Sequence, residues 1–487
     1  MQYEAVIGLE VHAELETRSK MFCSCPVVDS TIAEPNSAVC PVCTGMPGTL
    51  PVLNERAVEY ALRVALALNC EINTISIFAR KNYFYPDLPK GYQISQYEQP
   101  LAINGHLTIL TEKGEKVVRV RRVHLEEDTG KLTHFMNDDE AYSLVDLNRA
   151  GVPLLEIVTE PDMHSAEEVR QFAMALRSVL RYLGVNSGDM QKGVMRVEPN
   201  VSVRLVGSQE LGTRTEIKNL NSFRALERSI AYEIDRQGQA LDAGQNILLQ
   251  TLGWDEVQGK TVIQRSKEEA HDYRYFPEPD LPPLVIDTGY LDKIRESLPE
   301  LPAAKLKRFQ DQYQLTAYEA GVLIAIPDVA DYFEQVVCKT QELSPKFAAN
   351  WITGDLFNLL NQSGKEIGEI QITPAALAEL LLLISQGDIN QNTARLVLER
   401  MFATGHSASE IISELGLQQI SDRDIILTWV NSVIADHPDQ VDRYLAGKTS
   451  VINWLFGQVM RVAQGKANPE LLRQELEKQL AQKMSQE

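Results

Sequence analysis

AVIGLEVHAELE, residues 5–16, alternates apolar and polar side chains with a period of two. This alternation predicts a β-strand with one buried face, because successive side chains of a strand point to opposite sides of the sheet. The polar face would carry Glu10, His12 and Glu14, which are two carboxylates flanking an imidazole. The stretch therefore predicts an N-terminal strand of a sheet whose polar face could carry catalytic or metal-binding side chains.

Four further stretches repeat the pattern, at residues 117–128, 154–160, 196–204 and 213–218. Their charged faces would carry His124, Glu126, Asp128, Glu156, Glu160, Arg196, Glu198, Asn200, Arg204, Arg214, Glu216 and Lys218, with Glu127 on the opposite side of its strand. A water-facing sheet surface is the alternative, since antiparallel sheets often expose one face. We favour a catalytic face, because Glu, His, Arg and Asn are residue types that bind metal ions and clamp phosphate. The repeated pattern predicts a metal-dependent phosphoryl-transfer site.

The length of 487 residues predicts two to four domains. No apolar run approaches the length of a membrane span, and the chain begins with strand pattern, so we expect a cytoplasmic protein with no membrane partner. The net charge of -20 argues against general nucleic-acid binding, which leaves local basic patches or ordinary surface charge as alternatives. The candidate patches are Lys113, Lys116, Arg119, Arg121 and Arg122, and a C-terminal set that includes Lys448, Arg461 and Lys466.

Four cysteines, Cys23, Cys25, Cys40 and Cys43, lie within 21 residues. This spacing favours a tetrahedral zinc site inserted in the sheet domain, with four reduced thiols as the alternative. The zinc would be structural, because four thiolates leave no open coordination position.

Two segments without helical or strand periodicity are rich in aromatic and charged residues, at 81–97 (KNYFYPDLPKGYQISQY) and 271–283 (HDYRYFPEPDLPP). They are typical of ordered functional loops, although packing against a sheet edge would also explain their aromatic residues. Their candidate ligand-contacting residues are Lys81, Lys90, Gln93, His271 and Arg274.

Helix signals separate the strands. Asn54 should cap a helix to residue 68, Ser165 and Glu168 should form a capping box for a helix ending at Gly184, and Asn221 or Ser222 should open one ending at Gly238. After residue 295 the pattern is helical, with Thr373 before Pro374 as a start signal. We expect an α+β fold with a largely antiparallel sheet over residues 1–295, with the cysteine insertion at 23–43, followed by two all-α domains at 296–405 and 406–487.

Seven long motifs together resemble the B subunits of bacterial aspartyl/glutamyl-tRNA amidotransferases. They are IGLEVHAEL (7–15), KNYFYPDLPKGYQISQY (81–97), HLEEDTGK (124–131), DLNRAGVPLLEIVTEPD (146–162), MRVEPNVSVR (195–204), TEIKNLNSF (215–223) and DYRYFPEPDLPP (272–283). The resemblance implies a catalytic domain similar to the glutamine synthetase and guanido kinase fold. It also implies a helical connector and a small C-terminal domain that contacts tRNA through residues such as Lys448, Arg461 and Lys466.

The resemblance implies that ATP phosphorylates the side-chain carboxylate of Glu or Asp on misacylated tRNA, Glu-tRNA(Gln) or Asp-tRNA(Asn), and that ammonia displaces the phosphate. Which tRNA is served depends on the charged tRNAs that the cell makes. The implied partners are an amidase A subunit and a small C subunit. The chain has no Gly/Ser-rich amidase segment and no convincing Cys-His pair for glutamine hydrolysis, so the ammonia should come from a partner.

The family motifs and the strand faces together nominate site residues. Glu10, His12, Glu126 and Glu127 would bind Mg²⁺, with His12 also suited to Mn²⁺ or to orienting a carboxylate. Lys81, Arg214 and Lys218 would clamp phosphate. The remaining candidates are Glu156 and Glu216 as catalytic residues, and Asn148, Arg149, Glu198 and Asn200 as substrate or ATP contacts, with structural ion pairing as an alternative for Asn148, Glu156, Glu198 and Glu216.

Two other functions remain open from the sequence. One is a free-standing carboxylate-amine ligase acting on a small acid, which the acidic charge favours and the appended helical domains disfavour. The other is a non-catalytic tRNA-binding scaffold, whose polar sheet face would only contact the acceptor stem.

Overall fold

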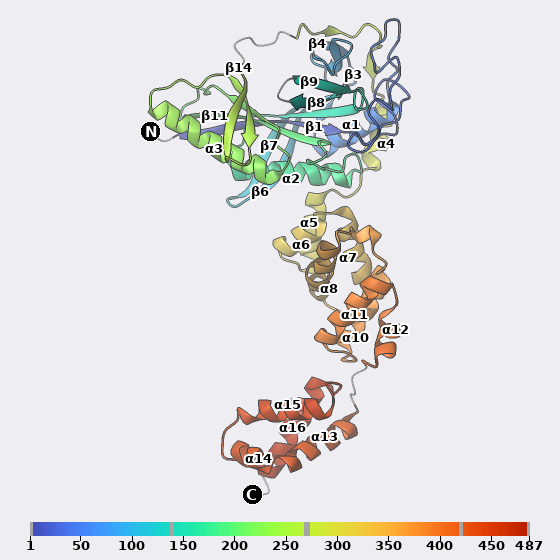
Figure 1. Cartoon of the computed structure of the whole chain (residues 1–487), viewed down its shortest axis with the longest axis vertical. Helices are drawn as coiled ribbons and strands as arrows, with labels where there is room; N and C mark the ends of the chain where they lie inside the picture. The colour runs from blue at the N-terminus through green and yellow to red at the C-terminus, as the bar shows by residue number, and fades with distance from the viewer. Residues whose placement is uncertain (1–2, 137–140, 267–272, 418–421, 485–487) are drawn as a thin grey trace. The chain divides into compact units, whose positions relative to one another are not determined.

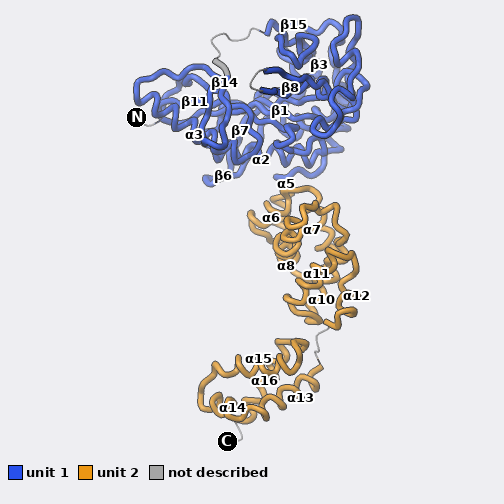
Figure 2. The backbone as a smooth tube through the Cα atoms, viewed as in Figure 1, with its two compact units in different colours: residues 1–304 blue, residues 305–487 orange. Residues whose placement is uncertain are grey.

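The computed structural model describes residues 3–136, 141–266, 273–417 and 422–484. The chain divides into two compact units, residues 1–304 and residues 305–487 (Figure 2). The first unit holds the β-strands and the second is helical (Figure 1). The expected α+β class, with a strand-rich first part and a helical second part, is confirmed.

Nine strands of the described residues form one sheet in the order β14-β13-β12-β11-β1-β10-β7-β6-β2. Neighbouring strands pair antiparallel except β12 and β13, which are parallel. The strands are β1 (Tyr3–Glu14), β2 (Glu71–Ile72), β6 (Ala102–Thr111), β7 (Gly114–Glu127), β10 (Pro153–Thr159), β11 (Met195–Leu205), β12 (Thr215–Lys218), β13 (Gln250–Asp255) and β14 (Lys260–Ser266).

The five strands predicted from charge alternation are β1, β7, β10, β11 and β12, and they are neighbours in the middle of this sheet. Their apolar face forms one core with the helices α1 (Glu55–Ala67), α2 (Ala166–Tyr182) and α3 (Phe223–Asp242). Ile7, Leu9 and Val11 of β1 are each at most 1% exposed. The helices therefore cover one face, and the charged side chains project from the other.

The helix starts predicted from capping residues are confirmed. The side chains of Asn54, Ser165 and Ser222 accept hydrogen bonds from the first-turn amides of α1, α2 and α3. The reciprocal half of the box at Ser165 is absent, because the Glu168 carboxylate accepts from the His164 N–H at 2.6 Å. The predicted end of α3 at Gly238 is wrong, since the helix continues to Asp242.

Three smaller sheets lie beside the large one in the first unit, with orders β15-β4-β5, β16-β3 and β8-β9. Their strands are β3 (Ile75–Ser76), β4 (Phe78–Asn82), β5 (Tyr92–Gln96), β8 (Lys131–Met136), β9 (Ala141–Asp146), β15 (Phe276–Pro277) and β16 (Leu284–Val285). The Arg80 guanidinium donates to both oxygens of the buried Glu278 carboxylate, at 2.7 and 2.8 Å. This pair joins Arg80 of β4, just before the aromatic-rich segment 81–97, to Glu278 of the second segment, 271–283.

The helices that follow the sheet are α4 (Thr288–Glu296), α5 (Pro302–Tyr313), α6 (Ala317–Ile324), α7 (Pro327–Lys339), α8 (Pro345–Trp351), the π-helical turn η1 (Ile352–Leu356), α9 (Phe357–Ser363), the short turn η2 (Ile367–Glu369), α10 (Pro374–Ser385), α11 (Gln391–Thr404), α12 (Ala408–Leu415), α13 (Arg423–Asp436), α14 (Pro438–Leu445), α15 (Val451–Val462) and α16 (Pro469–Met484). Thr373 caps α10, as predicted.

Two separate apolar cores lie in the helical part, one spanning Phe309 to Ile412 and one spanning Ile426 to Leu480. The buried residues of α12 belong to the first of these cores, although the predicted boundary at residue 405 places α12 in the C-terminal domain. The division into three domains stays a prediction. No helix in the described ranges combines the length and apolarity needed to cross a bilayer.

Candidate active site

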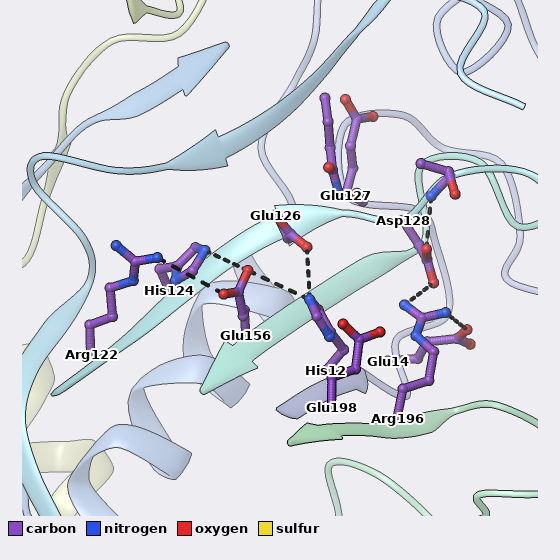
Figure 3. Close-up of polar contacts among 12 residues, drawn as sticks. His12, Glu14, Arg122, His124, Glu126, Glu127, Asp128, Glu156, Arg196 and Glu198 are labelled. Carbon is purple, nitrogen blue, oxygen red and sulfur yellow. Dashed lines mark hydrogen bonds and ion pairs between the residues drawn. The ribbon is translucent and has the colours of Figure 1, made fainter. Parts of the chain in front are cut away.

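The register of the sheet aligns the charged residues of four strands in one row. His12 on β1 pairs with Glu156 on β10 and with Arg196 on β11, and Glu156 pairs in turn with His124 on β7. A second row places Glu10 of β1 opposite Glu198 of β11. Cross-strand partners lie close enough for their side chains to touch, and Figure 3 shows the side chains of His12, Glu156 and His124 meeting on one face of the sheet.

His12, Glu126 and Glu156 form the first cluster, and their ligand atoms lie within 4.8 Å of one another. The His12 Nε2 atom is 3.8 Å from Glu126 Oε1 and 3.6 Å from Glu156 Oε2. Burial alone would lower the pKa of His12, but Glu156, Glu198 and Glu126 outweigh it and raise that pKa to about 9. Glu126 is 2% exposed, and its Oε2 atom and the His12 Nδ1 atom have no hydrogen-bond partner among the described residues. An imidazole and two buried carboxylates with ligand atoms within 4.8 Å of one another form a donor set that a divalent cation can share.

Basic side chains lie beside the Glu156 carboxylate. The His124 Nε2 atom lies 3.2 Å from one carboxylate oxygen, and an Arg122 nitrogen lies 4.0 Å from the other. Burial would raise the pKa of Glu156, but His124 and His12 hold it well below its usual range. Burial likewise disfavours the charged form of Lys81, yet the charges of Glu126 and Glu156 raise the pKa of Lys81. The predicted phosphate clamp Lys81 is therefore a fixed positive charge beside the first cluster.

Glu10, Glu198 and Glu216 form the second cluster, again with ligand atoms within 4.8 Å. The Lys218 ammonium lies between two of them, 2.6 Å from Glu198 and 3.2 Å from Glu216. Burial, together with the charges of Glu156, Glu216 and Glu198, raises the pKa of Glu10. Asn200 donates its Nδ2–H to Glu10 Oε1 at 3.1 Å. The sequence pattern nominated every residue in this cluster.

Tyrosines border the first cluster on the side of the two aromatic segments. The rings of Tyr97 and Tyr275 stack at 4.1 Å, and Arg122 lies over the Tyr97 ring. Lys81 lies over Tyr273, whose ring packs edge-on against Tyr275. The sequence did not nominate these tyrosines individually, because the density of aromatic residues was the only available signal, and it placed Arg122 only in a basic patch.

Glu127 lies outside both carboxylate clusters in the described structure. Its carboxylate pairs with Lys90 and accepts from the backbone N–H of Ile94 at 2.9 Å, while its carbonyl accepts from Gln93. The placement follows from strand geometry, since neighbouring residues point to opposite faces. The three candidates Lys90, Gln93 and Glu127 therefore form a separate group that links β5 to the end of β7.

Two further candidates bind the protein itself. Asn148 is fully buried and bonds to backbone atoms of residues 34 and 38. Arg149 donates to the carbonyls of Thr129 and Gly130. This geometry ties polar atoms of both side chains to the backbone, and the substrate role of these residues stays a prediction.

The remaining nominations are dispersed. Arg214 is exposed just before β12, and the exposed Arg274 has a left-handed φ of 45°. His271 lies outside the described residues. Lys448, Arg461 and Lys466 are exposed in the helical unit. In the other basic patch, ion pairs with Glu168, Asp162 and Glu160 neutralise Lys116, Arg119 and Arg121.

The four cysteines converge as predicted, with sulfur atoms within 4.8 Å of one another. Cys40 Sγ and Cys43 Sγ are 3.9 Å apart, close to the spacing of about 3.8 Å that Zn–S bonds of about 2.3 Å give in a tetrahedron. The fully buried Lys20 donates to Cys43 Sγ at 3.6 Å. Sequence periodicity did not reveal this lysine.

Comparisons with known proteins agree over both units. A family model described as the GatB/GatE catalytic domain matches residues 5–292, and one described as the GatB domain matches residues 331–480. The chain is 50% identical over 472 residues to a protein of Thermodesulfovibrio yellowstonii, covering 97% of this chain and 98% of that one. It is also 50% identical over 480 residues to a protein of Moorella thermoacetica, covering 99% and 100%. Both relatives are named as the B subunit of an aspartyl/glutamyl-tRNA(Asn/Gln) amidotransferase.

Proposed function

The chain belongs to the family of aspartyl/glutamyl-tRNA(Asn/Gln) amidotransferase B subunits, and we propose that the charged face of its sheet is where ATP phosphorylates the tRNA-bound amino acid. The chain is one component of a tRNA-dependent amidating ligase that acts with partner subunits. The substrates would be Glu-tRNA(Gln), Asp-tRNA(Asn) or both, giving Gln-tRNA(Gln) and Asn-tRNA(Asn).

One observation carries the proposal: two clusters of buried and half-buried ligand residues share strand β1, which contributes Glu10 to one cluster and His12 to the other. Glu10 and His12 are two residues apart on β1, which separates their Cα atoms by about 7 Å. His12, Glu126 and Glu156 would hold one divalent cation, Mg²⁺ or Mn²⁺, and Glu10, Glu198 and Glu216 would hold a second. Such cations neutralise the charge of a phosphoryl group that must approach a carboxylate.

The surrounding cations supply the other half of the proposed chemistry. Lys81 and Arg122 lie beside the first cluster and Lys218 beside the second, so phosphate oxygens placed above the sheet would meet positive charge on both sides. Their task is to hold donor and acceptor in line, which accounts for most of catalysis in phosphoryl transfer. Arg214, which is exposed just before β12, stays a predicted phosphate clamp. The fold similarity to glutamine synthetase and guanido kinases, which the family resemblance implies, is also part of this proposal.

Ammonia would come from an amidase A subunit held together with a small C subunit. Four of the six cysteines are gathered at the proposed zinc site, Cys70 is buried, and the exposed Cys338 lies on α7 in the helical unit. The C-terminal helices would contact tRNA through exposed residues such as Lys448, Arg461 and Lys466. The four cysteines would hold structural zinc.

The test is tRNA-dependent ADP formation by the chain with its partner subunits, using Glu-tRNA(Gln), ammonium and Mg²⁺. ADP and Gln-tRNA that appear only with charged tRNA would support the proposal. The Glu10→Gln variant separates the proposed phosphoryl-transfer site from a tRNA-binding scaffold, because a scaffold would keep product formation and a phosphoryl-transfer site would lose it by orders of magnitude. Unchanged turnover in that variant would reject the assignment.

A further inference from the structure

Residues 34–38 of the cysteine loop (residues 23–43) are hydrogen-bonded to residues 145–148, at the end of β9 and just after it. We call this contact the junction. Asn36 makes three of these bonds. Its backbone N–H donates to Asp146 Oδ1 at 2.9 Å, its Nδ2–H donates to the Val145 carbonyl at 3.0 Å, and its Oδ1 atom accepts from the Leu147 N–H at 2.8 Å. The two cysteine pairs lie on either side of this contact, so the metal site and the contact share one loop.

Asn148 completes the junction from the other side. Its Oδ1 atom accepts from the Ala38 N–H at 2.8 Å, and its Nδ2–H donates to the Glu34 carbonyl at 2.7 Å. Its own backbone N–H donates to Asp146 Oδ1 at 2.9 Å. The side chain is 0% exposed, and loss of a partner for a buried polar group is costly. The junction is therefore held by several buried or half-buried hydrogen bonds. Asn148, which makes three of them, was predicted from the sequence to contact substrate or ATP.

The same segment reaches the end of catalytic strand β7. The Gly151 N–H donates to the Asp128 carbonyl at 2.9 Å, and the Asp128 N–H donates to the Val152 carbonyl at 2.8 Å. Arg149 donates to the carbonyls of Thr129 and Gly130 at 3.0 and 2.6 Å. Asp128 is two residues beyond Glu126 and accepts from Arg196 at 2.9 Å (Figure 3).

A buried lysine adds a second connection between the cysteines and this segment. The Lys20 ammonium donates to Cys43 Sγ at 3.6 Å and to the Leu147 carbonyl at 3.2 Å. One donor thus joins a proposed zinc ligand directly to residue 147.

We propose that Asn148 is a positioning residue, which transmits the order of the cysteine loop through residues 146–151 to Asp128 and so fixes Glu126 at the first cluster. The inference rests on the proposed function, because it assigns Glu126 to the reacting site. Misplacement of a catalytic group by about 1 Å costs about a hundredfold in rate. A cysteine loop that is distant in sequence from Glu126 thereby sets the rate of phosphorylation.

The test compares Asn148→Ala with two other full-length variants, each purified with its partner subunits. Asn36→Gly removes two side-chain bonds of the same junction without strain, because the backbone φ of Asn36 is 57° and glycine adopts this conformation readily. Lys192→Ala is the control, because its ion pair with Asp29 holds the cysteine loop through a contact that includes none of residues 146–151.

Four quantities are measured: zinc content, the kcat and the KM of tRNA-dependent ADP formation, and amide hydrogen exchange at residues 34–38 and 126–152. We expect Asn148→Ala to retain zinc, to keep the KM for tRNA and to lose at least tenfold in kcat, with faster exchange at residues 146–152 and 128. Asn36→Gly should move kcat and exchange in the same direction, and Lys192→Ala should leave both within twofold of wild type.

A kcat within twofold of wild type in Asn148→Ala, or exchange that rises only at residues 34–38, would overturn the proposal. If Asn148→Ala does not fold, Asn36→Gly decides by the same criteria. The exchange measurement needs no catalysis, so it tests the link even if the wild-type complex makes no tRNA-dependent ADP, and that result would count against the proposed function alone.

Discussion

The Glu126→Gln substitution tests whether the first cluster acts through its negative charge. Glutamine keeps the size and polarity of the side chain but removes one charge from a position that is 2% exposed. At the 3.8 Å that separates Glu126 Oε1 from His12 Nε2, the interaction of that charge with one positive charge is about 4 kcal/mol at an effective dielectric constant of about 20. A divalent cation bound by the carboxylate would interact more strongly, so this figure is a lower bound.

A loss of about 4 kcal/mol in the transition state corresponds to about a thousandfold in kcat. The assay is single-turnover ADP formation with saturating Glu-tRNA(Gln), ATP and Mg²⁺, accompanied by a tRNA-binding measurement. We expect tRNA affinity to stay within twofold of wild type, because the change lies within the catalytic cluster. Glu112→Gln, in the exposed turn that joins β6 to β7, is the matched control and should be fully active. A kcat for Glu126→Gln within tenfold of wild type would refute the charge argument.

Three other predictions concern the framework around the site. Arg80→Ala should destabilise the first unit by about 3–5 kcal/mol in urea unfolding, because it leaves the buried Glu278 carboxylate without its partner; a loss below 1 kcal/mol would contradict this. Burial would raise the pKa of Glu233, but its interactions with Arg236 and Gln237 outweigh burial and lower that pKa. The ionised carboxylate therefore stabilises the fold above the unfolded pKa of about 4.5, and this stabilisation is lost as pH falls through the folded pKa. Glu233→Gln should therefore lower the melting temperature at pH 7, with a difference from wild type that shrinks only as pH falls below about 4.5, and a difference that stays constant below that pH would count against it. Deleting residues 422–487 removes the last core but leaves α12 in its own core, so filter binding should show weaker tRNA affinity with unchanged melting of the sheet unit, and unchanged affinity would exclude the tRNA role of this region.

The faces of the strands were predictable from the sequence, and their register was not. Alternation with a period of two is a local property, so His124, Glu156 and His12 could each be assigned to the charged face of a strand. Their alignment in one row depends on the register in which β7, β10 and β1 pair, and only the packed sheet fixes that register. The periodicity also separated Glu126 from Glu127, and the structure agrees by giving Glu127 the partner Lys90.

Local signals failed where tertiary contacts decide. Gly238 was predicted to end α3, but it lies inside the helix, where a side chain would come within 3.7 Å of the Tyr3 ring. A glycine inside a helix costs about 1 kcal/mol relative to alanine, which packing against β11 can offset. Asn148 shows the same limit, because nothing near it in the sequence reveals that its partners are residues 34 and 38.

The charge balance of the site indicates how nucleotide can enter it. Glu10, Glu126, Glu156, Glu198 and Glu216 converge on one face of a chain whose net charge is -20. Mutual repulsion is already visible in the raised pKa of Glu10, which burial and three neighbouring carboxylates produce. The phosphates of ATP would add further negative charge, and Lys218 is already engaged with Glu198 and Glu216. Because like charges at this spacing repel strongly when shielded from water, ATP entering the proposed site would have to arrive together with its metal ions, and the carboxylates that would repel bare phosphate would then select the metal complex.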